Sequence, residues 1–415
     1  MDRRQFLSAA GAFSTSALFA ADKANADAVA PATDRKGFAI DSPPVLQCPT
    51  PDGVTIAWAV TGPSAAWVDY GPTESLGKQA SSAFRGLAGC ESRFHSIRLS
   101  GLTPGTPVYY RVSAAPIHFA GPYKIMRGEP VISRIFRYTP PSLAAAQSSF
   151  AVINDTHERE PTMKALTDRL AADQADLTIW NGDVFNDIRS DDQIVRNVLR
   201  PAGAGYASER PVLFTAGNHD HRGIAARSLP QAFAPWPGDS ALPWCFAVRS
   251  GPVALIGLDT GEDKPDGHPA WAGLAAFEPY RRRQRDWLAS TLKRPDVASA
   301  PYLVVCCHIP LNGPADANGG DTLEGYAEYC KDARDLWHPL LAAAGVHLVI
   351  SGHTHAHRYD PPTPDRPYGQ LVGGGPDLER ATIIRGVADA EQLHVRTTNH
   401  QERLLGEWRY APRKS

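Results

Sequence analysis

Five short apolar runs in the second part of the chain each end directly at polar residues that can bind metal. The runs do not alternate apolar with polar residues, and segments with a helical pattern, such as residues 161–172 and 332–344, lie between them. This pattern is typical of strands buried on both faces of a largely parallel α/β sheet. Ligand sites of such sheets lie beyond the carboxyl ends of the strands, so we expect the five polar clusters to meet there. The runs are residues 150–153, 177–180, 212–215, 302–307 and 347–350.

Seven side chains in these clusters form a ligand set of two carboxylates, one carboxamide and four imidazoles. A nitrogen and oxygen set without thiolate suits Fe, Mn or Zn. Seven groups are too many for one catalytic ion that keeps an open position, so the sequence predicts two ions that share a carboxylate. Two ions about 3.5–4 Å apart can hold a phosphoryl oxygen and turn a bound water into the attacking hydroxide. The seven side chains are Asp155, His157, Asp183, Asn218, His308, His353 and His355.

The order of these motifs resembles that of the calcineurin-like metallophosphoesterases, and the similarity spans about residues 150–399. The resemblance implies a four-layer α/β/β/α sandwich with a dinuclear metal centre at the strand ends. It implies that Asp155, His157 and His355 bind one ion and that Asn218, His308 and His353 bind the other, with Asp183 between them. The motifs are Asp155-x-His157, Gly182-Asp183, Gly217-Asn218-His219-Asp220, His308 and Gly352-His353-x-His355.

The resemblance also implies a role for His219, which would contact the phosphate instead of a metal. It would help the leaving oxygen depart, as electrostatic stabiliser or general acid. Asp220 stands where many relatives carry Glu, and we interpret its carboxylate as orienting a neighbouring histidine. His221 and Arg222 lie beside these residues, and the sequence leaves open whether they support the metal ligands or contact substrate.

The region before the predicted catalytic domain resembles the amino-terminal domain of the purple acid phosphatases. Residues 42–139 contain short β-rich runs bounded by Pro and Gly, which predicts a small β-sandwich. Residues 102–112 resemble the tyrosine corner of fibronectin type III domains. We therefore expect a fibronectin-III-like sandwich at 41–140 and the catalytic domain at 150–400. One departure is Asn186, which stands where a purple acid phosphatase carries its metal-binding tyrosine, so we expect a colourless enzyme.

Residues 1–30 have the pattern of an export signal, with paired arginines at 3 and 4, an apolar run over 9–21 and a small-x-small site at 24–26. The paired arginines followed by Phe6 and Leu7 resemble a twin-arginine signal, and a general secretory signal is the alternative. We expect a periplasmic or secreted protein.

The formal net charge of -2 gives no broad basic surface, so neither nucleic acid nor an anionic membrane is an expected partner. The basic run 281–285 is interpreted as the solvated face of a helix whose Trp287, Leu288 and Leu292 face the core. Residues 261–273 and 312–325 are long loops of the kind that often determine specificity. Oligomeric state stays open.

The sequence thus predicts an exported metal-dependent phosphoesterase with a small phosphorylated substrate. The domain pair favours phosphate monoesters, and a phosphodiesterase of the same superfamily is the nearer alternative. A non-enzymatic periplasmic binding or adhesion protein that uses the fold as a scaffold is the alternative from another class.

Overall fold

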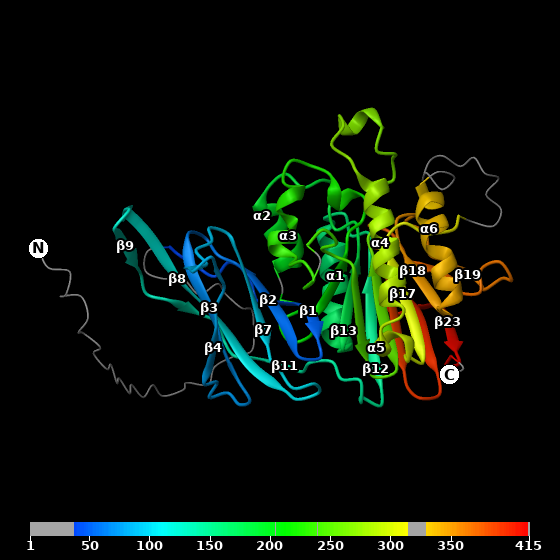
Figure 1. Ribbon diagram of the computed structural model, residues 1–415, viewed down its shortest axis with the longest axis horizontal. Helices are drawn as coiled ribbons and strands as arrows, with labels where there is room; N and C mark the ends of the chain where they lie inside the picture. Colours follow the sequence, from blue (N-terminus) through cyan, green and yellow to red (C-terminus); the bar gives the residue numbers. More distant parts are fainter. Residues whose placement is uncertain (1–36, 204, 239, 314–328, 414–415) are drawn as a thin grey trace, which may run out of the picture.

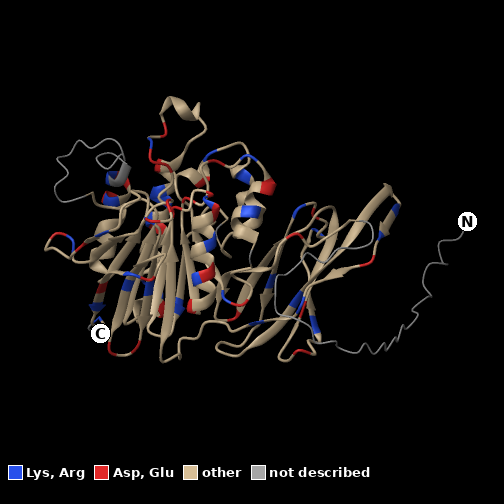
Figure 2. Cartoon of the chain, turned by 180° about the vertical axis from the view of Figure 1, so that it is seen from behind, with Lys and Arg blue, Asp and Glu red and all other residues tan. Residues whose placement is uncertain are grey.

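The structure is a computed structural model that describes residues 37–203, 205–238, 240–313 and 329–413. The export signal predicted for residues 1–30 lies outside these ranges. Within them, no helix combines the length and the apolar character needed to cross a membrane. Acidic and basic residues are interspersed along the described chain (Figure 2).

Two large sheets form the centre of the molecule (Figure 1). A nine-stranded sheet has the order β23-β22-β21-β12-β13-β14-β1-β2-β7, and a six-stranded sheet has the order β15-β16-β17-β18-β20-β19. The strands β12, β13 and β14 run parallel in the first sheet, as β16, β17, β18 and β20 do in the second.

The nine-stranded sheet comprises β1 (Val45–Thr50), β2 (Gly53–Ala59), β7 (Phe94–Ser100), β12 (Ser148–Ile153), β13 (Leu177–Asn181), β14 (Val212–Thr215), β21 (Thr382–Ala388), β22 (Leu393–Asn399) and β23 (Leu404–Tyr410). The six-stranded sheet comprises β15 (Phe246–Ser250), β16 (Val253–Leu258), β17 (Tyr302–Cys307), β18 (Leu348–Ser351), β19 (Arg358–Asp360) and β20 (Gly369–Val372).

The two sheets pack face to face, and helices cover both outer faces. In β17, Val304 and Cys306 pack between the sheets, whereas Val305 and Cys307 pack toward the helices. Both sides of the strand are therefore buried, which explains its uninterrupted apolar sequence. The result is the predicted four-layer α/β/β/α sandwich. The helices over the nine-stranded sheet are α1 (Glu160–Asp173), α2 (Asp191–Ile194) and α3 (Leu229–Ala232), and those over the six-stranded sheet are α4 (Phe277–Thr291), α5 (Pro295–Ala298) and α6 (Tyr329–Ala343).

The amino-terminal region is rich in β structure, as expected. A further sheet packs across an apolar core against β1, β2 and β7. Its likeness to fibronectin type III domains stays a prediction. The sheet comprises β3 (Ser64–Gly71), β4 (Lys78–Ala80), β8 (Val108–Gly121), β9 (Lys124–Arg127), β10 (Val131–Ile132) and β11 (Phe136–Tyr138), and β5 (Ala83–Phe84) pairs with β6 (Leu87–Ala88) beside it.

The amino-terminal region shares a sheet with the region that follows it. Strand β1 runs parallel to β14, with Gln47 opposite Val212, and the N–H of Leu46 donates to the carbonyl of Ala207 at 2.8 Å. The division into a β-sandwich at 41–140 and a catalytic domain at 150–400 stays a prediction. One hydrogen-bonded sheet contains strands from both of these segments. Tyr110 differs from a tyrosine corner, because its hydroxyl donates to the carbonyl of Ser208 at 2.5 Å and so joins the two regions.

The basic run 281–285 lies on α4, but Arg281 is buried, against the expectation of a solvated face. Its guanidinium donates to the carbonyls of Thr260 at 2.7 Å and Glu262 at 2.6 Å, and it pairs with Asp332. Arg281 thus fixes the backbone of the segment after β16. The burial of Leu288 in the core agrees with the prediction.

Candidate metal centre

The five polar clusters meet at one edge of the two packed sheets, as expected from the sequence. Three clusters follow β12, β13 and β14 in the nine-stranded sheet, and two follow β17 and β18 in the six-stranded sheet. The side-chain amide of Asn181 connects the two edges, since its Nδ2 donates to the carbonyls of Cys307 at 3.3 Å and Ile350 at 3.2 Å. The strand ends of both sheets are therefore held together at this point.

Six of the seven predicted ligands fall into three overlapping groups in which the candidate ligand atoms lie within 4.8 Å of one another. Asp183 belongs to two of these groups, in agreement with a position between two ions. His219 joins the middle group, although it was not expected to bind metal. The groups are Asp155 with His157 and His355, His157 with Asp183 and His219, and Asp183 with His308 and His353.

Asn218, the seventh predicted ligand, lies in the same place. Its side-chain Oδ1 is 2.9 Å from Nδ1 of His353. On the opposite side, Nε2 of His355 lies 3.1 Å from Nε2 of His157 and 3.4 Å from Oδ1 of Asp155. The structure therefore brings all seven side chains together.

The backbone at this edge is in an unusual conformation. Five of the seven residues have positive φ, namely Asp155 (50°), His157 (41°), Asp183 (52°), His353 (71°) and His355 (56°). Non-glycine residues rarely adopt such angles, and clusters of them are typical of functional sites.

Glycines allow the loops to approach one another closely at the centre. A Cβ atom on Gly217 would lie 2.2 Å from Oδ1 of Asp183, and one on Gly352 would lie 2.4 Å from Oδ2 of Asp155. No larger residue fits at these positions without moving a carboxylate.

The residues present fit bound cations. Oδ1 of Asp155 and Nε2 of His308 are buried and have no hydrogen-bond partner within the described ranges. Nδ1 of His308 lies 2.9 Å from the carbonyl of Asn181, to which it donates, so Nε2, which can take up a proton or a metal ion, faces the two carboxylates. Nε2 is 3.1 Å from Oδ2 of Asp183 and 3.8 Å from Oδ1 of Asp155. Buried polar atoms without partners are costly, and a cation among them would remove that cost.

The pKa shifts in the cluster also agree with bound cations. Burial opposes ionisation of Asp155 and Asp183, but the surrounding imidazoles outweigh it and hold the pKa of both carboxyl groups well below the usual range. Burial also opposes protonation of His308, but the two carboxylates raise its pKa to about 10. Both pKa shifts show that positive charge is stabilised between the two carboxylates, and a proton or a metal ion can supply it.

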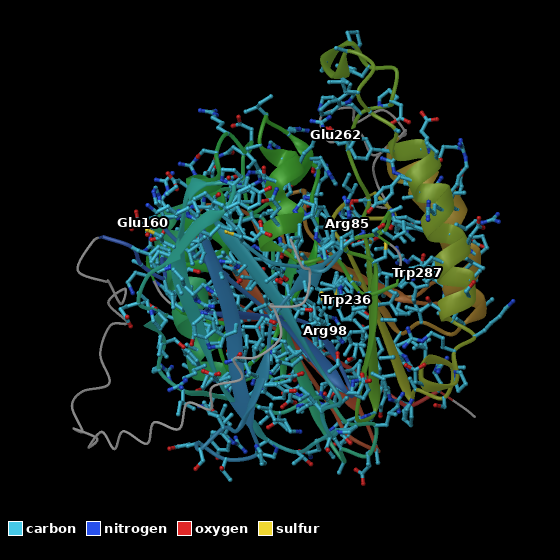
Figure 3. The ribbon with its side chains drawn as sticks, turned by 60° about the vertical axis from the view of Figure 1, so that its left-hand side comes forward. Arg85, Arg98, Glu160, Trp236, Glu262 and Trp287 are labelled. Atoms are coloured by element: carbon cyan, nitrogen blue, oxygen red, sulfur yellow. The ribbon has the colours of Figure 1, made fainter. Side chains whose placement is uncertain are left out.

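His219 lies at the border of this cluster. Its Nδ1 is 2.8 Å from the carbonyl of Asn186, and Nη1 of Arg222 is 2.9 Å from its Nε2. Burial lowers the pKa of His219, and the cationic Arg222 lowers it further against the opposing effect of Asp183. Arg222 in turn donates to Glu262 and, at 3.0 Å, to Asp263. Glu262 lies at the base of the loop above the sheets (Figure 3).

Asn186 contacts His157, with its Oδ1 3.3 Å from Nδ1 of the imidazole. The position expected for a tyrosine therefore carries a side chain that orients a candidate metal ligand.

Asp220 has a different role from the one expected. Its Oδ2 accepts from the N–H groups of Asp183 at 2.9 Å and Gly217 at 2.8 Å, and its Oδ1 accepts from those of Val184 at 3.0 Å and Phe185 at 3.3 Å. The carboxylate thus fixes the backbone around Asp183 instead of orienting a histidine.

His221 points away from the ligands, with Nε2 3.1 Å from Oδ1 of the buried Asp259. Sequence reasoning missed Asp259, although it follows β16 directly, as the other polar clusters follow their strands. Asn154, just before Asp155, supports the ligand loop, since its Nδ2 donates to Asp155 and to the carbonyl of Gly374 at 2.8 Å.

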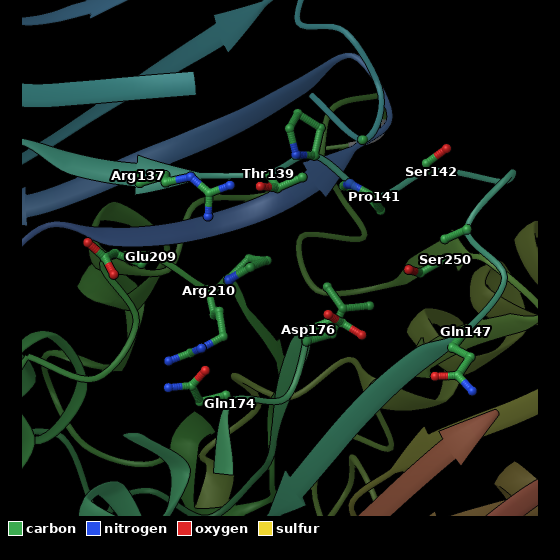
Figure 4. A pocket seen from close by; sticks show the side chains of 15 residues that line it. Arg137, Thr139, Pro141, Ser142, Gln147, Gln174, Asp176, Glu209, Arg210 and Ser250 are labelled. Atoms are coloured by element: carbon green, nitrogen blue, oxygen red, sulfur yellow. The ribbon is translucent and has the colours of Figure 1, made fainter. Parts of the chain in front are cut away.

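A separate cavity of about 510 Å³ lies at the opposite ends of the strands (Figure 4). Its lining includes Asp176 and Leu177 at the start of β13 and Pro211 just before β14, together with Arg137 and Arg210. None of the seven predicted ligands lines it.

Comparison with known proteins gives a consistent picture. Residues 148–357 match the family model described as calcineurin-like phosphoesterase. Probable purple acid phosphatase 20 of Arabidopsis thaliana is 24% identical over 330 residues, which are 74% of this chain and 66% of that protein. Purple acid phosphatase 21 of the same plant is 26% identical over 278 residues, or 65% of this chain and 54% of that protein. The chain thus spans less than two thirds of the length of several of these relatives.

Solved structures share the fold. The purple acid phosphatase PPD1 from yellow lupin (Lupinus luteus) seeds superposes with a TM-score of 0.62 at 15% identity, covering 89% of this chain and 74% of that one. The structure of PhoD superposes with a TM-score of 0.59 at 13% identity, covering 90% of this chain and 89% of that one. Both similarities extend across the amino-terminal β-rich region as well as the two packed sheets.

Proposed function

Since this chain belongs to the calcineurin-like phosphoesterase family, we propose that it is an exported, metal-dependent phosphoesterase that hydrolyses phosphate monoesters. The observation that carries the proposal is the meeting of seven ligand-type side chains at the strand ends, with buried donor atoms of Asp155 and His308 directed at one another.

Two metal ions, when bound, supply Lewis acidity toward the phosphoryl oxygens and acidify the water that attacks phosphorus. Asp155, His157 and His355 would hold one of them, Asn218, His308 and His353 the other, and Asp183 would contact both. Iron, manganese and zinc all suit this donor set. Asn186, at the place of a tyrosine, supplies no phenolate to give a coloured complex with ferric iron.

His219 and Arg222 are partly exposed at the border of the ligand cluster, and we place the phosphate ester against them. The carbonyl of Asn186 orients the ring of His219, and Glu262 and Asp263 hold the guanidinium of Arg222 beside it. Arg222 can donate hydrogen bonds to the charge that develops on the phosphoryl and leaving oxygens, and His219 can do so when its Nε2 carries a proton. We propose that His219 assists the departure of the leaving oxygen and that Arg222 orients the ring of His219.

The two-part, purple-acid-phosphatase-like organisation and the relatives named purple acid phosphatase support the proposed preference for monoesters over diesters. The pattern in residues 1–30 supports the proposed export by the twin-arginine route to the periplasm or beyond.

The test is hydrolysis by metal-free protein reconstituted separately with Mn, Zn or Fe. 4-Nitrophenyl phosphate and bis(4-nitrophenyl) phosphate release the same chromophore, so kcat/KM for the two can be compared directly. We expect turnover that depends on added metal and a higher kcat/KM for the monoester.

The other outcomes are equally informative. A higher kcat/KM for the diester would make the protein a phosphodiesterase of the same family. Absence of turnover of both esters by a fully metallated sample would contradict an enzymatic function and favour a binding or adhesion protein.

A further inference from the structure

A second hollow of about 610 Å³ lies beside the candidate metal centre, and we call it the aromatic groove. It lies between the short helix η3 (His219–His221), the segment around η5 (Pro269–Trp271) and the start of α4. The segment around η5 belongs to the loop above α4 in Figure 1. The residues used below are His221, Ile224, Asp259, Trp271, Leu274 and Phe277.

The aromatic groove and the metal centre lie at the same edge of the sheets. Strands β16 and β17 are parallel neighbours in which Leu258 lies opposite Cys307. The next residues are Asp259, which lines the groove, and His308, a candidate metal ligand, so the two leave adjacent strands at the same edge. From the other sheet, His219 and His221 belong to one helical turn. The groove is therefore the neighbouring surface for a molecule whose phosphate lies at His219.

The lining is mostly apolar and aromatic, and Arg227 also belongs to it. The ring of His221 lies edge-on to that of Phe277, with centroids 5.0 Å apart, and Trp271 lies 6.4 Å from Phe277. Leu274 is 74% exposed and Ile224 is 85% exposed. Large apolar side chains gathered around a hollow at this exposure are typical of a binding surface for an apolar group.

The buried carboxylate of Asp259 in the groove already has hydrogen-bond partners within the protein. Oδ1 of Asp259 lies 3.1 Å from Nε2 of His221 and accepts from the N–H of Gly261, and Oδ2 accepts from the hydroxyl of Tyr280 at 3.0 Å. Asp259 therefore supports the groove wall. Apart from Arg227, the side chains that face the groove favour an uncharged apolar group.

We propose that the aromatic groove binds the leaving group of the substrate, and that this substrate is a phosphate monoester of an aromatic or bulky apolar alcohol. The proposal rests on the proposed phosphoesterase function and specifies its substrate class. A hollow of this size accommodates a fused ring system.

The test compares phenyl phosphate with 2-naphthyl phosphate, using the fully metallated full-length protein. Both leaving groups are phenols, and they differ mainly by one apolar ring of about four carbons. We expect kcat/KM for the naphthyl ester to exceed that for the phenyl ester by about tenfold, since burial of the added apolar surface contributes that much. We also expect 2-naphthol to inhibit phenyl phosphate hydrolysis competitively.

Leu274→Ser and Ile224→Ser test the groove directly, because both side chains are exposed and contribute little to the folded core. Each should lower the naphthyl-to-phenyl ratio toward one and weaken inhibition by 2-naphthol. Leu87→Ser is the matched control, because Leu87 is 75% exposed but lies on β6 in the amino-terminal region, and it should keep the wild-type ratio.

Two outcomes would overturn the inference while the proposed function stands. One is a wild-type ratio near one with phenyl phosphate still hydrolysed, as expected if the groove instead binds a protein partner. The other is a high ratio that Leu274→Ser and Ile224→Ser leave unchanged. Absence of turnover of both esters would instead overturn the proposed function, and this inference with it.

Discussion

The two ends of strand β13 carry one aspartate each, and the comparison between them shows what distinguishes the candidate site. Asp176, before the strand, accepts hydrogen bonds from the N–H and the hydroxyl of Ser149 at 2.7 and 2.8 Å. Asp183, after the strand, is 1% exposed, has a φ of 52° and lies among imidazoles. The cavity at the Asp176 end is large and polar, yet buried ligand atoms, unusual backbone angles and shifted pKa values gather at the other end. A hollow alone therefore does not identify the functional edge.

The physical reason lies in the parallel strands. Their carboxyl ends point the same way, so the loops that follow them meet, whereas the amino ends receive incoming helices and connections. Asn181 and Asp220 then fix the meeting point through backbone groups of both sheets. The predictions below compare this edge with the opposite one, from the largest expected effect to the smallest.

Asp183→Ala should abolish activity, with a fall in kcat of about 10³-fold or more, because it removes the carboxylate shared by two groups of ligands. Metal content should fall in parallel. Elemental analysis and a 4-nitrophenyl phosphate assay measure both.

Asp176→Ala is its control at the other end of the same strand. It should keep metal and activity, since it removes an exposed carboxylate. Equal loss of metal and activity in the two variants would contradict the proposal that only the Asp183 end of the strand carries the metal site.

His219→Ala should keep both metal ions and lower kcat about 10²–10⁴-fold, the range for loss of one positioned acid or hydrogen-bond donor. His394→Ala, which removes a histidine that pairs with Glu407 on β23, should not change kcat. Loss of metal in His219→Ala would instead make His219 a ligand, as its place in the middle group allows.

Asp220→Asn should destabilise the fold by about 3 kcal/mol, because an amide nitrogen in place of Oδ2 cannot accept from the buried N–H groups of Asp183 and Gly217. Metal affinity should weaken as well. Urea unfolding and metal titration measure these effects.

Asp389→Asn is the matched control for Asp220→Asn. Asp389 follows β21 at the Ser148 end of β12, and it also accepts from two backbone N–H groups, those of Glu391 and Gln392. It lies at the surface, so its substitution should cost less stability and leave metal affinity unchanged.

The smallest effect concerns β18, which has His347 before it and His353 near its other end. Burial lowers the pKa of His347, so the unfolded chain takes up a proton more readily than the native protein does as pH falls below about 6.5. This group therefore contributes stability at neutral pH that is lost on acidification.

His347→Gln should reduce the loss of unfolding free energy between pH 7 and pH 5, measured by urea unfolding, and leave metal content unchanged. An unchanged pH dependence would show that His347 does not titrate in this way.

Much of this structure could be predicted, because both faces of the central strands are apolar and their ends carry the ligands. The strands β14 and β17 occur at the residues expected. Each apolar run and the polar cluster after it can be recognised from neighbouring residues. That the five clusters meet was predicted only from the rule that ligand sites lie beyond the carboxyl ends of parallel strands.

The remaining features depend on contacts between distant backbone groups. The continuity of β1 with β14 depends on one paired position, Gln47 with Val212, which no local pattern encodes. The roles of Arg281 and Asp220 likewise depend on carbonyls and N–H groups that only the folded chain brings near. The sequence around a charged residue does not indicate which distant backbone groups its side chain will bind.

The central claim is that seven side chains at one edge of the sheets hold a pair of cations. Anomalous diffraction from crystals of the protein reconstituted with manganese or zinc tests it most directly. We predict two anomalous peaks per chain on either side of the Asp183 carboxylate, one near His157 and His355 and one near His308 and His353. A single peak, no peak, or peaks at the Asp176 end of the strands would contradict the account.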